Sequence, residues 1–166
     1  IRSEGERASQ VRTIAEKLDE PIGVAFKDGA LYVSATSKIL RLPGIEQNLE
    51  HPPKSTVFRD GLPGERWHGG KFIAFGPDGW LYLNVGAPCN VCEPDERHGA
   101  LFRIAPDGTT MERVAHGLRN SVGFDWNPVD HTLWFTDNGR DLLGDDLPPD
   151  ELNRIDGKDP DFGFPY

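Results

Sequence analysis

The sequence has few residues of the kinds that mark thiolate-metal, membrane-spanning or nucleic-acid-binding proteins. Its 166 residues include only 2 Cys and 1 Met. No apolar run approaches the ~20 residues that span a bilayer. Lys and Arg number 18 against 27 Asp and Glu, a formal net charge of −9. Nucleic acids and anionic membranes are themselves negatively charged, so this balance argues against both as partners.

The sequence also lacks a signal peptide, and it begins at Ile1 rather than Met. We therefore expect a processed protein or a fragment, and the missing signal does not indicate a compartment.

The two cysteines form the motif CNVC, Cys89 to Cys92. Haem attachment would need His at the next position, which is Glu93, and a zinc site would need a second pair of ligands. The spacing favours a small loop disulfide, typical of an oxidising compartment, with free thiols as the alternative.

Gly 19 and Pro 14 are high and helix-forming runs are scarce, which favours an all-β protein with many turns. Three segments repeat one design, an apolar strand, a turn rich in Asp, Gly or Pro, and a second strand with aromatic or β-branched residues. A phenylalanine recurs in them every 49 residues. The segments are PIGVAFKDGALYVS (21–34), KFIAFGPDGWLYLN (71–84) and SVGFDWNPVDHTLWFT (121–136), and the phenylalanines are Phe26, Phe75 and Phe124.

Each unit continues into a third strand that contains an arginine (38–42, 100–104 and 151–155), and TVFRDGL and MERVAHGL are plausible outer strands. A period near 50 residues with about four strands per unit is typical of propeller blades. We predict a β-propeller of four-stranded antiparallel blades, with units near 21–60, 71–115 and 121–166. The repeat predicts an outer strand over 10–18 within a lead-in of 1–20, although Val11, Ile14, Ala15 and Leu18 have helical spacing. A closed propeller needs at least four blades, so we expect 1–166 to be a partial propeller domain of about three blades.

The residues just before each inner strand should meet at one mouth of the propeller axis. They include an acid pair, an imidazole, two cations and an amide, which suit an anionic ligand or proton transfer. Ordinary solvated loop residues are the alternative. The positions are Asp19, Glu20, His68, Lys71, Arg119 and Asn120.

An acidic stretch follows, with nine acids and three bases over residues 137–161. Calcium prefers carboxylate and carbonyl oxygens in flexible loops, which makes a calcium site reasonable here. The spacing does not match an EF-hand loop, and a solvated acidic loop explains the composition equally well.

The motifs HGGKFIAFGPDGWLYLNVGAPCNVC, HGLRNSVGFDWNP, LWFTDNGRD and DDLPPDELNRI, in this order, resemble the glucose/sorbosone dehydrogenase family. The stretches GAPCNVC and TDNGRDLLGDDLPPDELN resemble its L-sorbosone dehydrogenase-like branch. The resemblance covers most of the chain from about Leu18. It implies a six-bladed propeller that binds pyrroloquinoline quinone (PQQ) and calcium and oxidises sugars or related aldoses, in the periplasm or outside the cell.

The resemblance also implies site residues. His68 would be the base that removes the hydroxyl proton as hydride passes to the quinone. Arg119 and Asn120 match the family's G-x-R-N motif, whose guanidinium would bind the quinone oxygens. Calcium would be held by backbone carbonyls of Gly139 and Arg140 and would polarise the quinone. Asn138 matches a polar residue near the cofactor, and Asp150 and Glu151 lie where some members bind a second calcium.

The chain departs from the family's pattern in three places. The family commonly has histidine four residues before the Lys or Arg that opens the strand, a position held here by Trp67, whereas His68 lies three before Lys71. We take His68 as the base, although Trp67 could face the cofactor and stack on it. The better-studied branch orients its histidine with an aspartate where this chain has Ala87. The family's later blades also supply basic residues to the cofactor, beyond Tyr166.

We thus expect a PQQ- and calcium-dependent sugar or sorbosone dehydrogenase, with a sugar substrate and a cytochrome or quinone as electron acceptor. The 166-residue piece alone could be inactive. One alternative is a calcium-dependent propeller lactonase or hydrolase using Asp19, Glu20, Asn120 and Asp137. The other is a non-catalytic propeller binding module. The remaining histidines, His51, His98, His116 and His131, are expected to be solvated at turns or strand edges.

Overall fold

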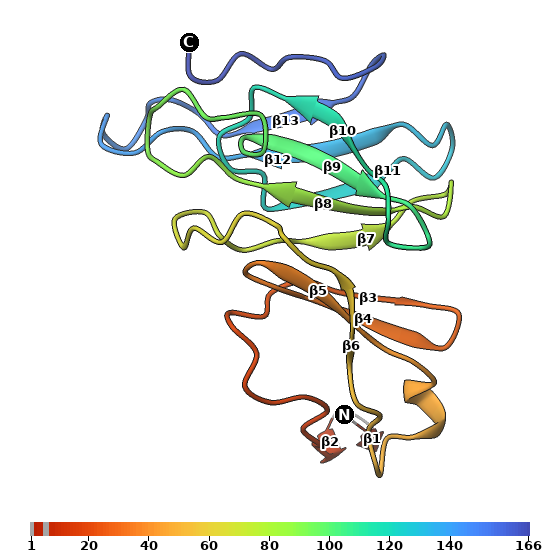
Figure 1. Cartoon of the computed structure of the whole chain (residues 1–166). Helices are drawn as coiled ribbons and strands as arrows, with labels where there is room; N and C mark the ends of the chain where they lie inside the picture. The colour runs from red at the N-terminus through yellow and green to blue at the C-terminus, as the bar shows by residue number, and fades with distance from the viewer. Residues whose placement is uncertain (1, 5–6) are drawn as a thin grey trace.

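The computed structural model describes residues 2–4 and 7–166 and consists almost entirely of β-strands. Three antiparallel sheets are stacked between the N-terminus at the bottom of Figure 1 and the C-terminus at the top. Among the described residues, the only helical element is the 3-10 turn η1 (Ile45–Gln47). None of the described helices is long or apolar enough to cross a lipid bilayer.

The three sheets span residues 24–59, 73–116 and 123–154, and the all-β propeller-type fold is confirmed. The first two have four strands and the third has three in the described chain. The first sheet comprises β3 (Val24–Lys27), β4 (Ala30–Ala35), β5 (Lys38–Leu42) and β6 (Thr56–Arg59). The second comprises β7 (Ile73–Phe75), β8 (Leu81–Val85), β9 (Ala100–Ile104) and β10 (Met111–His116), and the third β11 (Gly123–Trp126), β12 (Leu133–Asp137) and β13 (Glu151–Arg154). A separate hairpin pairs β1 (Arg2–Glu4) with β2 (Arg7–Gln10).

The core lies between the sheets, where β8 is buried along its whole length. Its alternating side chains serve two clusters: Leu81, Leu83 and Val85 pack toward the first sheet, and Tyr82 packs toward the third. Because alternate side chains of a strand point to opposite faces, a strand in the middle of a stack is apolar on both faces, and in β8 only Asn84 departs from this pattern. The second sheet is therefore the centre of the described fold.

The outer strand expected over 10–18 is wrong beyond residue 10. Residues 11–18 contain no strand, and Ile14, Ala15 and Leu18 pack against the buried cluster of Val33, Leu42 and Ile45. A strand would send the adjacent Ile14 and Ala15 to opposite faces, so both face the same cluster only in an irregular conformation. The edge of the first sheet is instead occupied by β6.

A buried polar side chain lies at or next to the end of the second strand in each of the three stacked sheets. Each accepts hydrogen bonds from backbone N–H groups that precede the first strand of the same sheet, which fixes the loop that leads into that strand. The bonds run from Gly23 to Ser34 Oγ (2.8 Å), from Phe72 to Asn84 Oδ1 (2.6 Å), and from Arg119 and Asn120 to Asp137 Oδ2 and Oδ1 (2.9 and 2.7 Å).

These polar positions show that the 49-residue phenylalanine spacing slips by one residue in the third unit. The position held by Val24 and Ile73 is taken by Gly123, as their pairings across the sheets show. Since successive residues of a strand alternate between faces, a slip of one residue reverses the face. Accordingly Phe124 is 7% exposed, whereas Phe26 is 50% exposed.

Candidate functional site

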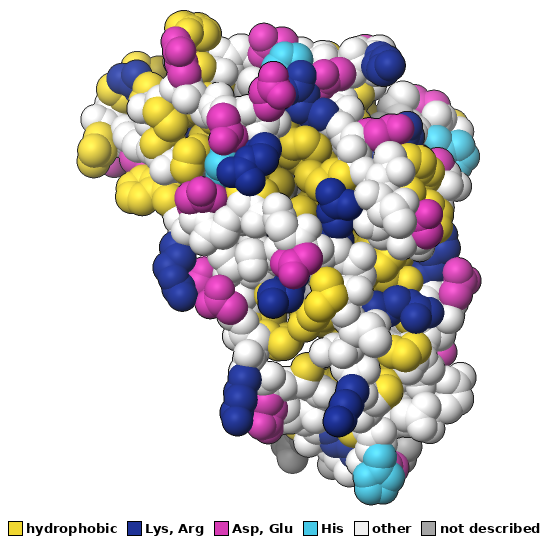
Figure 2. Space-filling model, in the orientation of Figure 1, with side chains coloured by type: hydrophobic (Ala, Val, Ile, Leu, Met, Phe, Trp, Pro, Cys, Tyr) yellow, Lys and Arg dark blue, Asp and Glu magenta, His cyan; other side chains and the backbone are white. Residues whose placement is uncertain are grey.

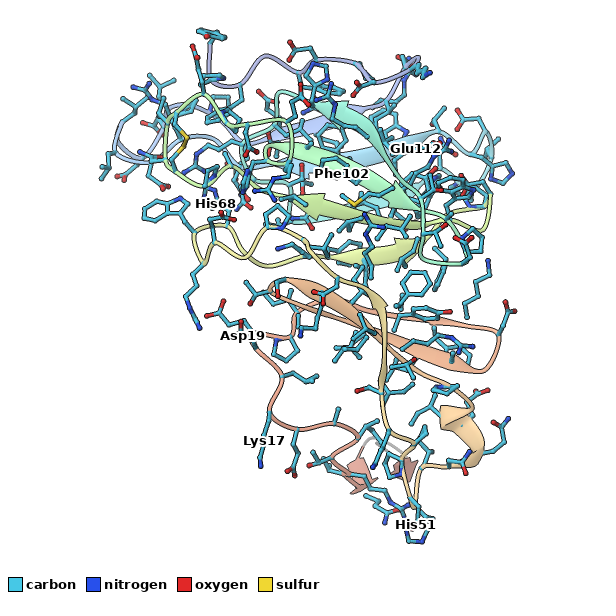
Figure 3. The ribbon with its side chains drawn as sticks, viewed as in Figure 1. Lys17, Asp19, His51, His68, Phe102 and Glu112 are labelled. Atoms are coloured by element: carbon cyan, nitrogen blue, oxygen red, sulfur yellow. A yellow bond between two sulfur atoms is a disulfide. The ribbon has the colours of Figure 1, made fainter. Side chains whose placement is uncertain are left out.

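The loop before β7 and the segment before β11 bring His68 close to Arg119 and Asn120. Figure 3 shows His68 on the side of the molecule where Asp19 also lies, with Glu112 of β10 toward the opposite end of the second sheet. Gly86 separates His68 from Asn120, because a methyl group at Gly86 would lie 2.5 Å from His68 Cβ and 3.1 Å from Asn120 Oδ1. Of the six residues expected at the mouth, the structure thus brings His68, Arg119 and Asn120 close together.

The ring of His68 is held by the backbone of Ala87. His68 Nδ1 lies 2.8 Å from the Ala87 carbonyl oxygen. A carbonyl only accepts hydrogen bonds, so Nδ1 carries the proton and Nε2 keeps its lone pair. The main chain of Ala87 thus orients the His68 ring.

The surroundings of His68 favour its neutral form. Burial lowers the pKa of the His68 imidazole below its usual value, and the charge of Arg119 lowers it further. The Ala87 carbonyl and Asp141 act in the opposite direction. His68 also has a left-handed backbone, φ 51°, which costs a non-glycine residue roughly 1–2 kcal/mol and persists only where neighbouring structure imposes it. A neutral, oriented imidazole has the properties of a general base.

Trp67 lies beside this ring but faces solvent more than His68 does. Its indole is 53% exposed, and the two rings meet edge to face with centroids 5.8 Å apart. His68 is the half-buried member of the pair and the one that contacts the segment after β8, at Ala87. Trp67 is therefore available to contact a ligand at the rim beside His68.

Lys71 does not belong to the mouth, contrary to expectation. Its side chain is 2% exposed, and Nζ donates 2.9 Å hydrogen bonds to the carbonyls of Pro63 and Gly69. Burial lowers the pKa of this amine to about 8. Lys71 therefore fixes the loop that contains His68 and does not face a ligand site.

Arg119 is the most constrained side chain of the site, at 4% exposed. Nε donates to the Asn90 carbonyl (3.0 Å), Nη2 to Asn90 Oδ1 (2.8 Å) and Asp141 Oδ2 (2.9 Å), and Nη1 to the Asn138 carbonyl (3.3 Å). Of its five N–H groups, one on Nη1 has no acceptor among the described residues. The guanidinium is thus oriented by the protein with one donor to spare.

Arg119 lines one side of a cavity of about 360 Å³ that also includes half of the other predicted site residues. Asp137, Asn138, Gly139, Arg140 and Glu151 contribute to its wall, together with prolines and aromatics from the C-terminal segment. His68, Trp67 and Asn120 lie outside this lining, and Arg119 connects the two groups.

The turn at Asn138 and Gly139 is fastened by Asp150. Asp150 Oδ1 accepts the Gly139 N–H at 3.0 Å, and Oδ2 lies 3.5 Å from Asn138 Nδ2. Within the described chain, the carbonyls of Gly139 and Arg140 accept no hydrogen bond. No group of three or more His, Cys, Asp or Glu side chains in the described residues is arranged to hold a metal ion. Any cation here would depend on carbonyl oxygens.

The carboxylates proposed for a lactonase-type metal site are separated and engaged. Asp19 and Glu20 both form ion pairs with the exposed Arg66. Asp137 accepts two backbone N–H groups, and burial raises the pKa of its carboxyl. The arrangement offers this alternative no convergent set of ligands.

His98 is the prominent residue that the sequence interpretation misplaced. It is 7% exposed rather than solvated, with Nδ1 2.6 Å from Asp95 Oδ1 and Nε2 3.0 Å from Glu65 Oε2. Glu65 lies three residues before His68, so His98 fastens the loop of the candidate base. Its position after PDER gave no periodic signal, because the partners come from two different loops.

The disulfide between Cys89 and Cys92 is present, as the CNVC spacing favoured. It closes the loop that contains Asn90, the main partner of Arg119.

A sequence profile of the glucose/sorbosone dehydrogenase family matches residues 33–166. The chain belongs to the glucose/sorbosone dehydrogenase family. An uncharacterised protein of Borreliella burgdorferi is 35% identical over 168 residues, which cover 95% of this chain and 44% of that protein. The chain thus spans less than half the length of the curated relative it matches.

Solved structures of two dehydrogenases share the fold. A Thermus thermophilus protein, assigned as an oxidoreductase of the glucose dehydrogenase type, is similar with a TM-score of 0.71 and 24% identity, over 96% of this chain and 56% of that one. The PQQ-bound aldose sugar dehydrogenase of Streptomyces coelicolor gives 0.57 and 20%, over 93% of this chain and 65% of that one. In this glucose/sorbosone dehydrogenase family member, the His68 loop lies close to the segment that contains Arg119 and Asn120.

Proposed function

We propose that this family member forms part of a PQQ- and calcium-dependent dehydrogenase that oxidises a sugar or sugar aldehyde. The observation that carries the proposal is the pairing of a neutral, oriented imidazole with a fixed guanidinium, His68 beside Arg119. A base and an anion-stabilising cation are the two protein groups that hydride abstraction from a carbinol requires.

The donor set at the site suits a quinone with carboxylate and carbonyl oxygens. Arg119 has one uncommitted N–H, and the amides of Asn120 and Asn138 are 3.5 Å apart, a contact too long to occupy either firmly. These groups would bind PQQ, and Trp67 would flank it. When bound, PQQ supplies the electron-accepting carbonyl.

Calcium fits the turn at Gly139 and Arg140. Both residues line the cavity together with Glu151, their carbonyl oxygens accept no hydrogen bond in the described chain, and carbonyl and carboxylate oxygens are the ligands that calcium prefers. Asp150, which already fastens the turn, and Glu151 would hold a second calcium of structural type.

In the proposed reaction, His68 Nε2 removes the proton of the substrate hydroxyl, and the Ala87 carbonyl stabilises the imidazolium that results by accepting from Nδ1. Arg119, held by Asn90 and Asp141, offers its remaining N–H to developing negative charge without reorganising. The L-sorbosone dehydrogenase-like branch suggests a sorbosone-type substrate, a cytochrome or quinone acceptor, and a periplasmic or secreted location.

Reconstitution with PQQ and calcium tests the proposal. The whole protein should reduce an electron-acceptor dye in the presence of aldoses or sorbosone, and His68→Ala should lower the turnover about 10² to 10⁴-fold, the usual contribution of a general base. His131→Ala is the matched control, because His131 lies exposed in a turn of the third sheet. Undiminished turnover in His68→Ala would remove His68 from the mechanism, and no quinone binding would refute the proposed function.

A further inference from the structure

Asn90 is the one residue of the disulfide loop (Cys89–Cys92) that contacts Arg119. We propose that Asn90, held in place by the disulfide, is the positioning residue that orients the Arg119 guanidinium toward the cofactor cavity. The expected effect on PQQ affinity rests on the proposed function. The contact between Asn90 and Arg119 does not depend on it.

Asn90 accepts two hydrogen bonds from the Arg119 guanidinium. Its backbone oxygen accepts Nε–H at 3.0 Å, and its side-chain oxygen accepts Nη2–H at 2.8 Å. These two donors lie on one edge of a planar group, so two acceptors from a single residue fix both the place and the plane of the guanidinium. The N–H without a described acceptor is consequently on Nη1, away from this edge.

The orientation of Asn90 is set in turn by the loop around Asp141. Asn90 Oδ1 also accepts the Asp141 N–H at 2.8 Å, and Asn90 Nδ2 donates to the Asp141 carbonyl at 3.2 Å. Since the Asp141 carboxylate accepts Arg119 Nη2 at 2.9 Å, the three residues form a closed set of hydrogen bonds. Every polar atom of the Asn90 amide group has a partner, which leaves the amide no second orientation.

The disulfide provides the remaining restraint. Asn90 lies directly after Cys89, and the bond to Cys92 closes a loop of only four residues around it. A loop this short contributes little to global stability through chain entropy, because that contribution grows with loop length. Its effect is local: it prevents the segment from extending and withdrawing the Asn90 carbonyl from Arg119.

The sequence predicts a loop disulfide at CNVC and a resemblance to the L-sorbosone dehydrogenase-like branch at GAPCNVC, but no site role for these residues. The structure connects the motif to the G-x-R-N motif, 29 residues away at Arg119, through backbone and side-chain atoms of one residue. Asn90 and the disulfide thus act through Arg119 and do not themselves contact substrate.

Three variants of the protein test the inference. Asn90→Ala removes the side-chain acceptor, and the double variant Cys89→Ser with Cys92→Ser frees the loop while keeping Asn90. Val91→Ala is the control, since Val91 is an exposed residue of the same loop and accepts none of the hydrogen bonds of Arg119. PQQ affinity is measured by absorbance titration in calcium, and the hydrogen exchange and ¹⁵N shift of Arg119 Nε–H by NMR.

We expect the first two variants to bind PQQ roughly ten- to a hundredfold more weakly, the loss typical of hydrogen bonds to a charged group. Arg119 Nε–H should exchange faster in both, and Val91→Ala should match the unaltered protein in both measurements. If Asn90→Ala keeps a protected Arg119 Nε–H and binds PQQ within twofold of the unaltered protein, the inference is overturned.

The NMR measurement separates the two proposals. Should the unaltered protein fail to bind PQQ, the proposed function fails, and the exchange of Arg119 Nε–H alone decides the role of Asn90. Faster exchange in Asn90→Ala and in the cysteine double variant would then support positioning, and unchanged exchange would refute it.

Discussion

His68 combines a strained backbone with a ring fixed at one nitrogen, and both follow from how closely the chain approaches it. Ala87 binds Nδ1, and Gly86, the preceding residue, lies against His68 Cβ. Only glycine has no side chain at this point of contact. The conformation of the candidate base thus depends on the absence of one methyl group in the neighbouring segment.

Gly86→Ala should displace His68 and lower turnover by one to two orders of magnitude, because its methyl would lie 2.5 Å from His68 Cβ. Gly123→Ala is the matched control, since nothing lies within 4 Å of a methyl at that strand position. Dye-reduction kinetics with reconstituted protein measure both. Equal turnover in the two variants would show that His68 tolerates the shift.

At the scale of elements, loops rather than strands form the site, and ion pairs connect them. His98 lies between Glu65 of the His68 loop and Asp95 of the segment after the disulfide. Its hydrogen bonds lower the pKa of both carboxyl groups. Both ring nitrogens of His98 therefore face carboxylate oxygens, one from each loop. The arrangement joins two loops that share no strand pairing.

His98→Gln should lower the melting temperature by about 2–4 °C near neutral pH, the effect of losing about 1 kcal/mol in a domain of this size. Glu65 and Asp95 have folded-state pKa values below their unfolded values of 4.5 and 3.8. Their contribution is therefore present above those values and is lost as pH falls through the folded pKa values. The difference between the variant and the unaltered protein should shrink in acid.

Thermal unfolding followed by circular dichroism at neutral and acidic pH measures this difference, with His131→Gln as the exposed control. A difference that stayed constant into strong acid would assign the stabilisation to packing of the ring instead.

At the scale of the whole described molecule, the sheets are joined by buried polar contacts as well as by apolar clusters. Ser34 Oγ accepts the Gly23 N–H and donates to the Lys71 carbonyl at 2.6 Å, connecting the first sheet to the loop that enters the second. The surface of these stacked sheets carries both signs of charge among apolar patches (Figure 2). The hydrogen bonds of Ser34 therefore help to align the first sheet with the second.

Ser34→Ala should lower the free energy of unfolding by about 1–3 kcal/mol, because it leaves a buried N–H and a buried carbonyl without their partner. The melting temperature should fall roughly 3–8 °C. Ser55→Ala, at an exposed position, should have no measurable effect. A melting temperature equal in both variants would mean that water replaces the hydroxyl.

The strand order, the positions of most strands and the meeting of His68 with Arg119 and Asn120 were predictable from the sequence. These features depend on the alternation of apolar and polar residues within each strand and on a repeat near 50 residues, and both can be read directly from the sequence. Where the signal was short or ambiguous, as at 11–18, packing against Val33 and Leu42 overrode it. The one-residue shift of Phe124 was not predictable, because a pattern of apolar residues does not show which residues pair across neighbouring strands.

The sequence by itself determined the family, the all-β architecture and the identity of the residues before each inner strand. Only the tertiary structure decided what those residues do. It buried Lys71 as a loop anchor, placed His98 between two acids, and gave Arg119 its partners in Asn90 and Asp141. The physical reason is that hydrogen bonds between loops join residues tens of positions apart, and no periodicity in the chain encodes which acceptor a given donor will reach.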